Sequence, residues 1–166
     1  MTPKSLLRHK LSVSSLEELT QGGFRTVIDD IALGGAPEAG VTIERGGVRR
    51  ILLCSGKIYY ELLAARRERA LDWVALVRVE QLYPFPAKEL EAVFAAYPEA
   101  RQVCWVQEEP WNMGAWHVMY RRLRRVLPED RTLNYAGRPE AASPATGSFK
   151  LHLAEERELV NAALAR

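Results

Sequence analysis

The stretch VCWVQEEPWNMGAW, from Val103 to Trp116, contains a strand, a turn and the start of a helix. Val103 to Val106 form a short apolar run typical of a buried strand, and Glu108 and Glu109 place acidic side chains at its exit. Pro110 is expected to stop the strand before the next helix begins. Because ligands and partners gather at the carboxyl ends of strands in open α/β sheets, this acidic pair marks where function is expected. The alternative is that both carboxylates are solvated or paired with nearby arginines.

Strand and helix patterns alternate along most of the chain. The expected strands are residues 48–54, 73–80, 103–106 and 132–135. The expected helices are residues 57–70, 87–97 and 114–127, followed by a last helix that Ser148 can cap. This alternation predicts an α/β fold, a three-layer α/β/α sandwich with a mainly parallel sheet.

The segments before residue 48 are less regular. Residues 24–28 resemble a short strand, and residues 29–47 are rich in glycine and are expected to form a loop or a loose hairpin. We therefore divide the chain into an N-terminal lead-in or linker, residues 1–25, and an α/β domain, residues 26–166.

The composition excludes several classes of function. With 48% hydrophobic and 27% charged residues, the chain has the make-up of an ordinary globular protein, and its net charge of +2 gives no reason to expect nucleic acid as a partner. It has no apolar run of membrane-spanning length, so no membrane partner is expected. Cys54 and Cys104 lie in apolar strands, which fits buried, reduced thiols in a cytoplasmic protein.

The sequence contains no self-contained catalytic motif. A Walker-type phosphate loop and a GxSxG elbow are both missing, and the three histidines are far apart in sequence. No catalytic, cofactor-binding or metal-binding residue is therefore predicted. Ser55-Gly56-Lys57 could hold an anion where a strand meets a helix, but the same letters also describe a plain helix start.

Five motifs, in order, carry a resemblance to a known family. They closely resemble the carboxyl-terminal region of the thiamine-diphosphate-dependent decarboxylase component of the 2-oxoglutarate dehydrogenase complex. The motifs are MTPKSLLRHK, CSGKIYYELL, VRVEQLYPFP, VQEEPWNMGAW, and YAGRP followed by SPATGS. The resemblance implies a domain like the carboxyl-terminal domain of transketolase.

The resemblance also implies a function for the parent enzyme. Such an enzyme decarboxylates 2-oxoglutarate oxidatively and passes the succinyl group to the lipoyl arm of the complex's second component. Its thiamine diphosphate and magnesium lie between two preceding domains, and the magnesium-binding GDG…N pattern of such enzymes is not present here. The resemblance thus implies a structural and regulatory domain that is inactive alone, with those preceding domains and the second subunit of a homodimer as partners.

Two groups of residues follow as site predictions. Glu108, Glu109, Asn112 and Trp116 are expected to contact the neighbouring domain or second subunit. Lys4 and Arg8 are expected to contact an acetyl-CoA or nucleotide effector. The alternative hypothesis is a free-standing module of the same fold that binds a nucleotide or a partner protein.

Overall fold

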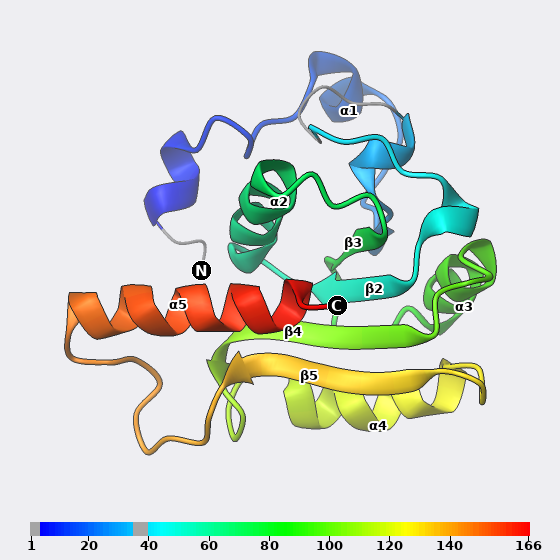
Figure 1. The fold of residues 1–166 in the computed structure, drawn as a ribbon. Helices are drawn as coiled ribbons and strands as arrows, with labels where there is room; N and C mark the ends of the chain where they lie inside the picture. Colours follow the sequence, from blue (N-terminus) through cyan, green and yellow to red (C-terminus); the bar gives the residue numbers. More distant parts are fainter. Residues whose placement is uncertain (1–3, 35–39) are drawn as a thin grey trace.

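The computed structural model describes residues 4–34 and 40–166, and these residues form a five-stranded sheet with helices on both faces (Figure 1). The strand order is β1-β3-β2-β4-β5. Strands β2 to β5 pair in parallel, and β1 is antiparallel to β3. The strands are β1 (Val27–Ile28), β2 (Arg50–Cys54), β3 (Val74–Val79), β4 (Gln102–Pro110) and β5 (Thr132–Arg138).

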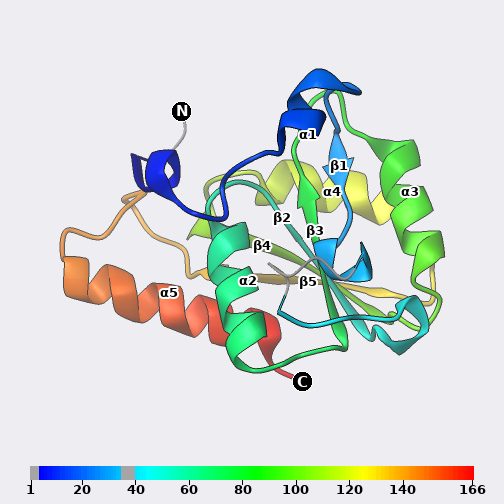
Figure 2. The same cartoon turned by 90° about the horizontal axis from the view of Figure 1, so that it is seen from above.

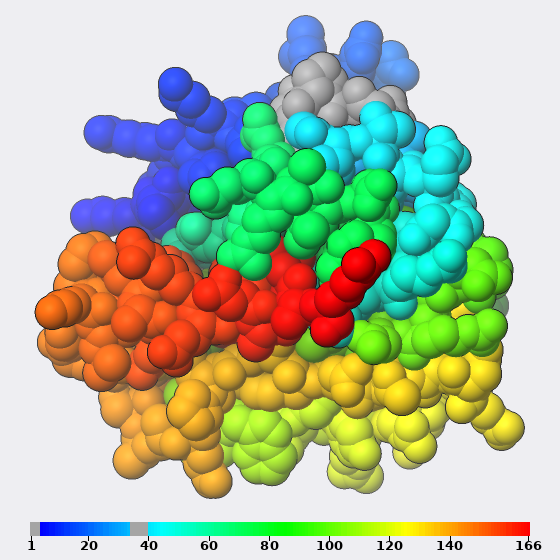
Figure 3. Space-filling model, in the orientation of Figure 1, coloured from blue at the N-terminus to red at the C-terminus, as the bar shows by residue number. Residues whose placement is uncertain are grey.

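The helices form the outer layers of the predicted α/β/α sandwich, which is confirmed. Helices α2 (Ile58–Glu68) and α5 (Phe149–Leu164) cover one face of the sheet. Helices α3 (Ala87–Ala96) and α4 (Trp116–Val126) cover the opposite face (Figure 2). In the space-filling view, α2 and α5 lie against each other above the edge formed by β5 (Figure 3). Ser148 caps α5 as predicted, since its hydroxyl accepts a hydrogen bond from the Leu151 N–H.

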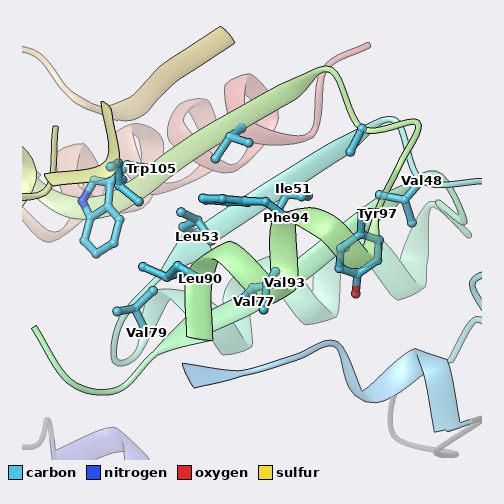
Figure 4. Packing of buried hydrophobic residues seen from close by; sticks show 14 of the residues in the cluster. Val48, Ile51, Leu53, Val77, Val79, Leu90, Val93, Phe94, Tyr97 and Trp105 are labelled. Atoms are coloured by element: carbon cyan, nitrogen blue, oxygen red, sulfur yellow. The ribbon is translucent and has the colours of Figure 1, made fainter. Parts of the chain in front are cut away.

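The sheet separates two hydrophobic cores. Side chains alternate along β2, so Ile51 and Leu53 face α3 and α4 whereas Leu52 and Cys54 face α2 and α5. The core between the sheet and helices α3 and α4 is called the first core. Figure 4 shows it, with Phe94 from α3 packed over the central strands. Burial on both faces explains why the central strands read as continuous apolar runs rather than as alternating ones.

Strand β4 is longer than predicted. It continues beyond Val106 to Pro110, which pairs with Arg138 after an irregularity in the register. Proline is tolerated in strands at such irregularities because it has no N–H to contribute to the ladder. Pro110 is the last residue of β4, as expected, but the strand continues beyond the apolar run, so the acidic pair belongs to the end of β4 itself.

The first part of the chain consists of short helical turns. These are η1 (Lys4–Arg8), α1 (Leu16–Thr20), η2 (Ile31–Gly34) and η4 (Arg45–Gly47). The predicted loop over residues 29–47 is thus partly helical, and its residues 35–39, like residues 1–3 of the lead-in, lie outside the described part of the chain.

Asp30 fixes this region to the sheet. Its carboxylate is buried, accepts a hydrogen bond from the Leu76 N–H at 2.5 Å and forms an ion pair with the buried Arg66.

Across residues 4–34 and 40–166, helices with the length and apolar character needed to span a bilayer are absent.

Candidate functional site

The ends of β4 and β5 and the first turns of α5 enclose a cavity of about 480 Å³ at the carboxyl end of the sheet. Glu108 and Glu109 reach it from β4, and Arg138 reaches it from β5. Phe149 and His152 on α5 form another wall. The location agrees with the general rule for open α/β sheets, whose sites lie beyond the carboxyl ends of the strands.

Gln107 holds the turn that follows β4. Its side-chain oxygen accepts hydrogen bonds from the Trp105 indole N–H at 2.9 Å and from the Trp116 backbone N–H at 3.0 Å. Its amide nitrogen donates to the carbonyl oxygens of Met113 at 2.8 Å and of Glu109 and Pro110 at 3.3 Å. Because this side chain is buried, these bonds fix the path of the chain from the acidic pair to α4.

Asn112 ties the same turn to the loop that follows β5. Its side-chain nitrogen donates to the Ala141 carbonyl at 2.9 Å, and its side-chain oxygen accepts from the Ala141 N–H at 3.1 Å. The loop continues to Pro144 and Thr146, which line the cavity. Asn112 therefore helps to position one wall of the cavity.

Lys57 is surrounded by three carboxylates. Its ammonium nitrogen lies 2.6 Å from Glu156, 3.3 Å from Glu108 and 3.4 Å from Glu61. Burial alone would lower the pKa of Lys57, but the hydrogen bond to Glu156 and the nearby carboxylates outweigh it and raise the pKa. With these partners Lys57 is a poor ligand for an anion, so the plain helix start is the better interpretation of Ser55-Gly56-Lys57.

The N–H groups of the Arg138 side chain donate to other residues of this chain. Its guanidinium donates to the Glu108 carbonyl at 2.7 Å and to the Pro144 carbonyl, and it forms an ion pair with Glu155 at 3.3 Å. Glu109, in contrast, forms no ion pair with any residue in the described ranges. The cavity therefore has one carboxylate without a countercharge.

Exposed aromatic side chains surround this end of the sheet. Tyr83 follows β3 and is 80% exposed, and Phe149 is 75% exposed. Trp111 follows β4, and 42% of its surface is exposed. Arg122 holds Tyr83 by lying over its ring, 5.4 Å from the centroid, while donating to the Leu82 carbonyl. We call Tyr83, Glu108, Glu109, Trp111 and Phe149 the carboxyl-end surface.

The four predicted interface residues lie in different environments. Glu108 and Glu109 lie together at the cavity, and Asn112 acts on the adjacent loop. Trp116 differs from the expectation, because only 7% of its surface is exposed and its ring packs in the first core against Tyr135. It is the first residue of α4, whose apolar face is turned to the sheet, so it supports the fold rather than an exposed contact surface.

The predicted effector residues Lys4 and Arg8 lie at the two ends of η1, and both are exposed. Between them Leu6 is buried, and the ring of His9 lies 4.9 Å from that of Tyr60. The lead-in therefore packs on α2, and its basic side chains remain free to meet a ligand.

Several residues of the cavity were not identified from the sequence. Arg138 comes from β5, and Phe149 and His152 come from α5, so only the fold brings these two stretches together beside β4. Beside the acidic pair, the one indication of this site in the sequence was Gln107, a polar residue directly after a buried apolar run.

Metal ligands are not grouped in the described part of the chain. Within residues 4–34 and 40–166, no three side chains of His, Cys, Asp or Glu are arranged to hold an ion. The thiols of Cys54 and Cys104 are buried, and burial raises the pKa of each to about 12. Neither thiol is therefore activated as a nucleophile at neutral pH.

Comparison with known proteins gives a consistent result. Residues 13–164 match the family described as 2-oxoglutarate dehydrogenase C-terminal. The chain is 46% identical, over 99% of its length, to the 2-oxoglutarate dehydrogenase E1 component of Coxiella burnetii. It is 43% identical to that of a Geobacillus species over 100% of its length, and 48% identical to that of Brucella anthropi over 93%. The chain spans 16–17% of the length of these relatives.

Proposed function

The chain belongs to the 2-oxoglutarate dehydrogenase C-terminal family, and on that premise we propose that it is the supporting, catalytically inactive part of an enzyme that oxidatively decarboxylates 2-oxoglutarate. The observation that carries this proposal is that residues 13–164 match a carboxyl-terminal family, while the relatives are about six times longer than the chain. The remaining length of such an enzyme would hold the chemistry.

The carboxyl-end surface is the proposed contact with the rest of the enzyme or with a second subunit. Aromatic side chains are enriched in protein interfaces, and Tyr83, Trp111 and Phe149 are all exposed at this end. Arg122 restrains Tyr83, so little side-chain freedom would be lost on contact. Glu108 and Glu109 would add charge selectivity at the same place.

The residues at the cavity do not fit thiamine diphosphate with magnesium. Glu108, Glu109 and Glu156 give the cavity an acidic lining that would repel a diphosphate, and the donors of Arg138 are already engaged. We therefore propose that the cofactor and its metal are bound by other parts of the enzyme, and that this chain contributes no step of the reaction.

Two further roles belong to the proposal, one for the whole enzyme and one for the first part of this chain. Transfer of a succinyl group to a lipoyl-bearing second component is part of the proposed activity of the whole enzyme. Contact of Lys4 and Arg8 with an acetyl-CoA or nucleotide effector is a proposal supported by their exposure and charge on η1. The free-standing module is not favoured, because the match with the enzyme family covers nearly the whole chain.

A segment exchange tests the proposed function. The matching segment of the Coxiella burnetii relative would be deleted, or replaced by this chain, and 2-oxoglutarate-dependent activity would be measured with thiamine diphosphate and magnesium present. We expect activity from the exchanged protein and none from the deleted protein or from this chain alone. Turnover by the isolated chain, or full activity after deletion, would contradict the proposal.

A further inference from the structure

We propose that the cavity between β4, β5 and α5 is a binding site for an organic cation, a guanidinium or ammonium group carried on an apolar stem. Free amines and the side chains of arginine and lysine share this chemistry. The proposal goes beyond the supporting role described above. The site is formed by this chain and shares Glu108, Glu109 and Phe149 with the carboxyl-end surface, so a cationic side chain of the contacting domain or subunit is one of the sources that the test distinguishes.

The shape of the site suits a small molecule or a single side chain. Its volume of about 480 Å³ lies within the range of small-ligand pockets. Phe149 and Leu159 of α5 provide apolar walls, and Pro144 closes the site from the loop after β5. An alkyl stem placed between these side chains would remove apolar surface of both partners from water.

The charges of the residues that line the cavity favour a cation as the ligand. Glu108, Glu109 and Glu156 line the cavity, against Arg138 as the one positively charged side chain among its lining residues. Lys57 balances Glu108 and Glu156 from outside the lining, and Arg138 pairs with Glu155. Glu109 is then the carboxylate left to receive a cationic group.

The position of Phe149 supports the same ligand class. Phe149 lines the cavity and is 75% exposed, and its ring centroid lies 6.4 Å from that of His152. Aromatic faces attract cations, and guanidinium groups stack on them particularly well. An anion would gain nothing comparable, because the Arg138 donors point to Glu108, Pro144 and Glu155 instead of the cavity.

A matched pair of probes tests the proposal. The full 166-residue chain would be labelled with nitrogen-15 and titrated, at neutral pH and low salt, with butylguanidinium or with butylurea, which has the same shape but no charge. We expect butylguanidinium to shift the amide signals of Glu109, Thr146 and Phe149 saturably and to bind at least tenfold more tightly than butylurea. Equal binding of the two probes, or no saturable shift up to about 20 mM, would overturn the proposal.

Two variants and one further probe complete the test. Glu109→Gln keeps the size of an exposed side chain and should abolish the preference for the cation, whereas Arg157→Gln, on an exposed position of α5, should leave it unchanged. A cation preference that survives Glu109→Gln would refute the assigned role of Glu109. N-acetyl-arginine methylamide distinguishes the sources: binding at least as tight as that of butylguanidinium indicates a polypeptide, and tenfold weaker binding indicates a free amine.

Discussion

The side-chain oxygen of Gln107 accepts a hydrogen bond from the backbone N–H of Trp116 at 3.0 Å, so the end of β4 is joined directly to the first residue of α4. The same oxygen accepts from the Trp105 indole, and the amide nitrogen satisfies three carbonyls of the turn. One buried side chain thus determines the geometry of the corner that presents the acidic pair.

Replacing Gln107 should destabilise the chain strongly. Gln107→Leu keeps the volume but leaves several buried donors and acceptors without partners, so we expect a loss of about 2–4 kcal/mol in the free energy of unfolding. Urea denaturation measures the loss. Gln21→Leu, at an exposed position, is the control and should change stability by less than about 0.5 kcal/mol. A loss below about 1 kcal/mol for Gln107→Leu would show that water replaces these bonds at little cost.

Two tryptophans that belong to the same motif should respond differently to truncation. Trp116 is 7% exposed, so Trp116→Ala should cost about 3–5 kcal/mol in unfolding free energy. Trp111 is 42% exposed, so Trp111→Ala should cost less than about 1 kcal/mol. Similar losses for both variants would contradict the assignment of one ring to the core and the other to the carboxyl-end surface.

The fold could be predicted because its signals are local. The apolar run from Ile51 to Cys54 and the alternation of strands and helices depend on neighbouring residues, and they predicted the three layers. The lengths of β4 and β5 could not be predicted in this way. Their extension depends on pairing of Pro110 with Arg138, a contact between residues far apart in sequence.

The candidate site could be predicted only in part. Glu108 and Glu109 were identified because they follow an apolar run, but Trp116 was assigned to an interface although it is a core residue. A tryptophan after a turn has the same sequence signature in both roles. The neighbours of the acidic pair, such as Phe149 and Lys57, come from distant segments that no sequence pattern relates.

The buried ion pair between Asp30 and Arg66 should be sensitive to the loss of one partner. Arg66→Met leaves the Asp30 carboxylate buried without a countercharge, and we expect a loss of about 3–5 kcal/mol in unfolding free energy. Adding Asp30→Asn should restore at least about half of this loss, because the uncompensated charge is then removed.

An exposed pair provides the control. Arg49 lies 3.4 Å from Glu99 with 58% of its side chain accessible, so Arg49→Met should change stability by less than about 0.5 kcal/mol. If Arg66→Met were equally mild, the ion pair would contribute little to holding η2 against the sheet.

The two thiols should make stability depend on pH in the alkaline range. Burial raises the pKa of Cys54 and of Cys104 from 9.0 to about 12, so the unfolded chain loses these protons first. Their contribution is fully present below pH 9 and is lost as the pH rises from 9 to about 12. Urea midpoints measured between pH 8 and pH 11 should therefore fall, and less steeply in the Cys54→Ala/Cys104→Ala variant.

Thiol titration provides an independent check on this prediction. At pH 8 the native chain should react with almost no Ellman's reagent, whereas the urea-unfolded chain should release two equivalents of thiolate dye per chain. Rapid labelling of either thiol in the native chain would mean that its strand opens readily.

Asn112 should control the loop beyond β5 without controlling the whole fold. Asn112→Ala removes both hydrogen bonds to Ala141, so the Ala141 amide should exchange with solvent at least about tenfold faster. Exchange at Leu76, in the central sheet, is the internal reference and should not change. Unchanged exchange at Ala141 would show that the loop is held by other contacts.

Because the sheet lies between two hydrophobic cores, Leu62 on α2 and Leu90 on α3 belong to different cores. Substitutions in one layer should then add independently to those in the other. Because of this independence, residues on one side of the sheet can be substituted during evolution without requiring changes on the other side. It offers one physical reason why sequences that differ at about half of their positions can belong to the same family.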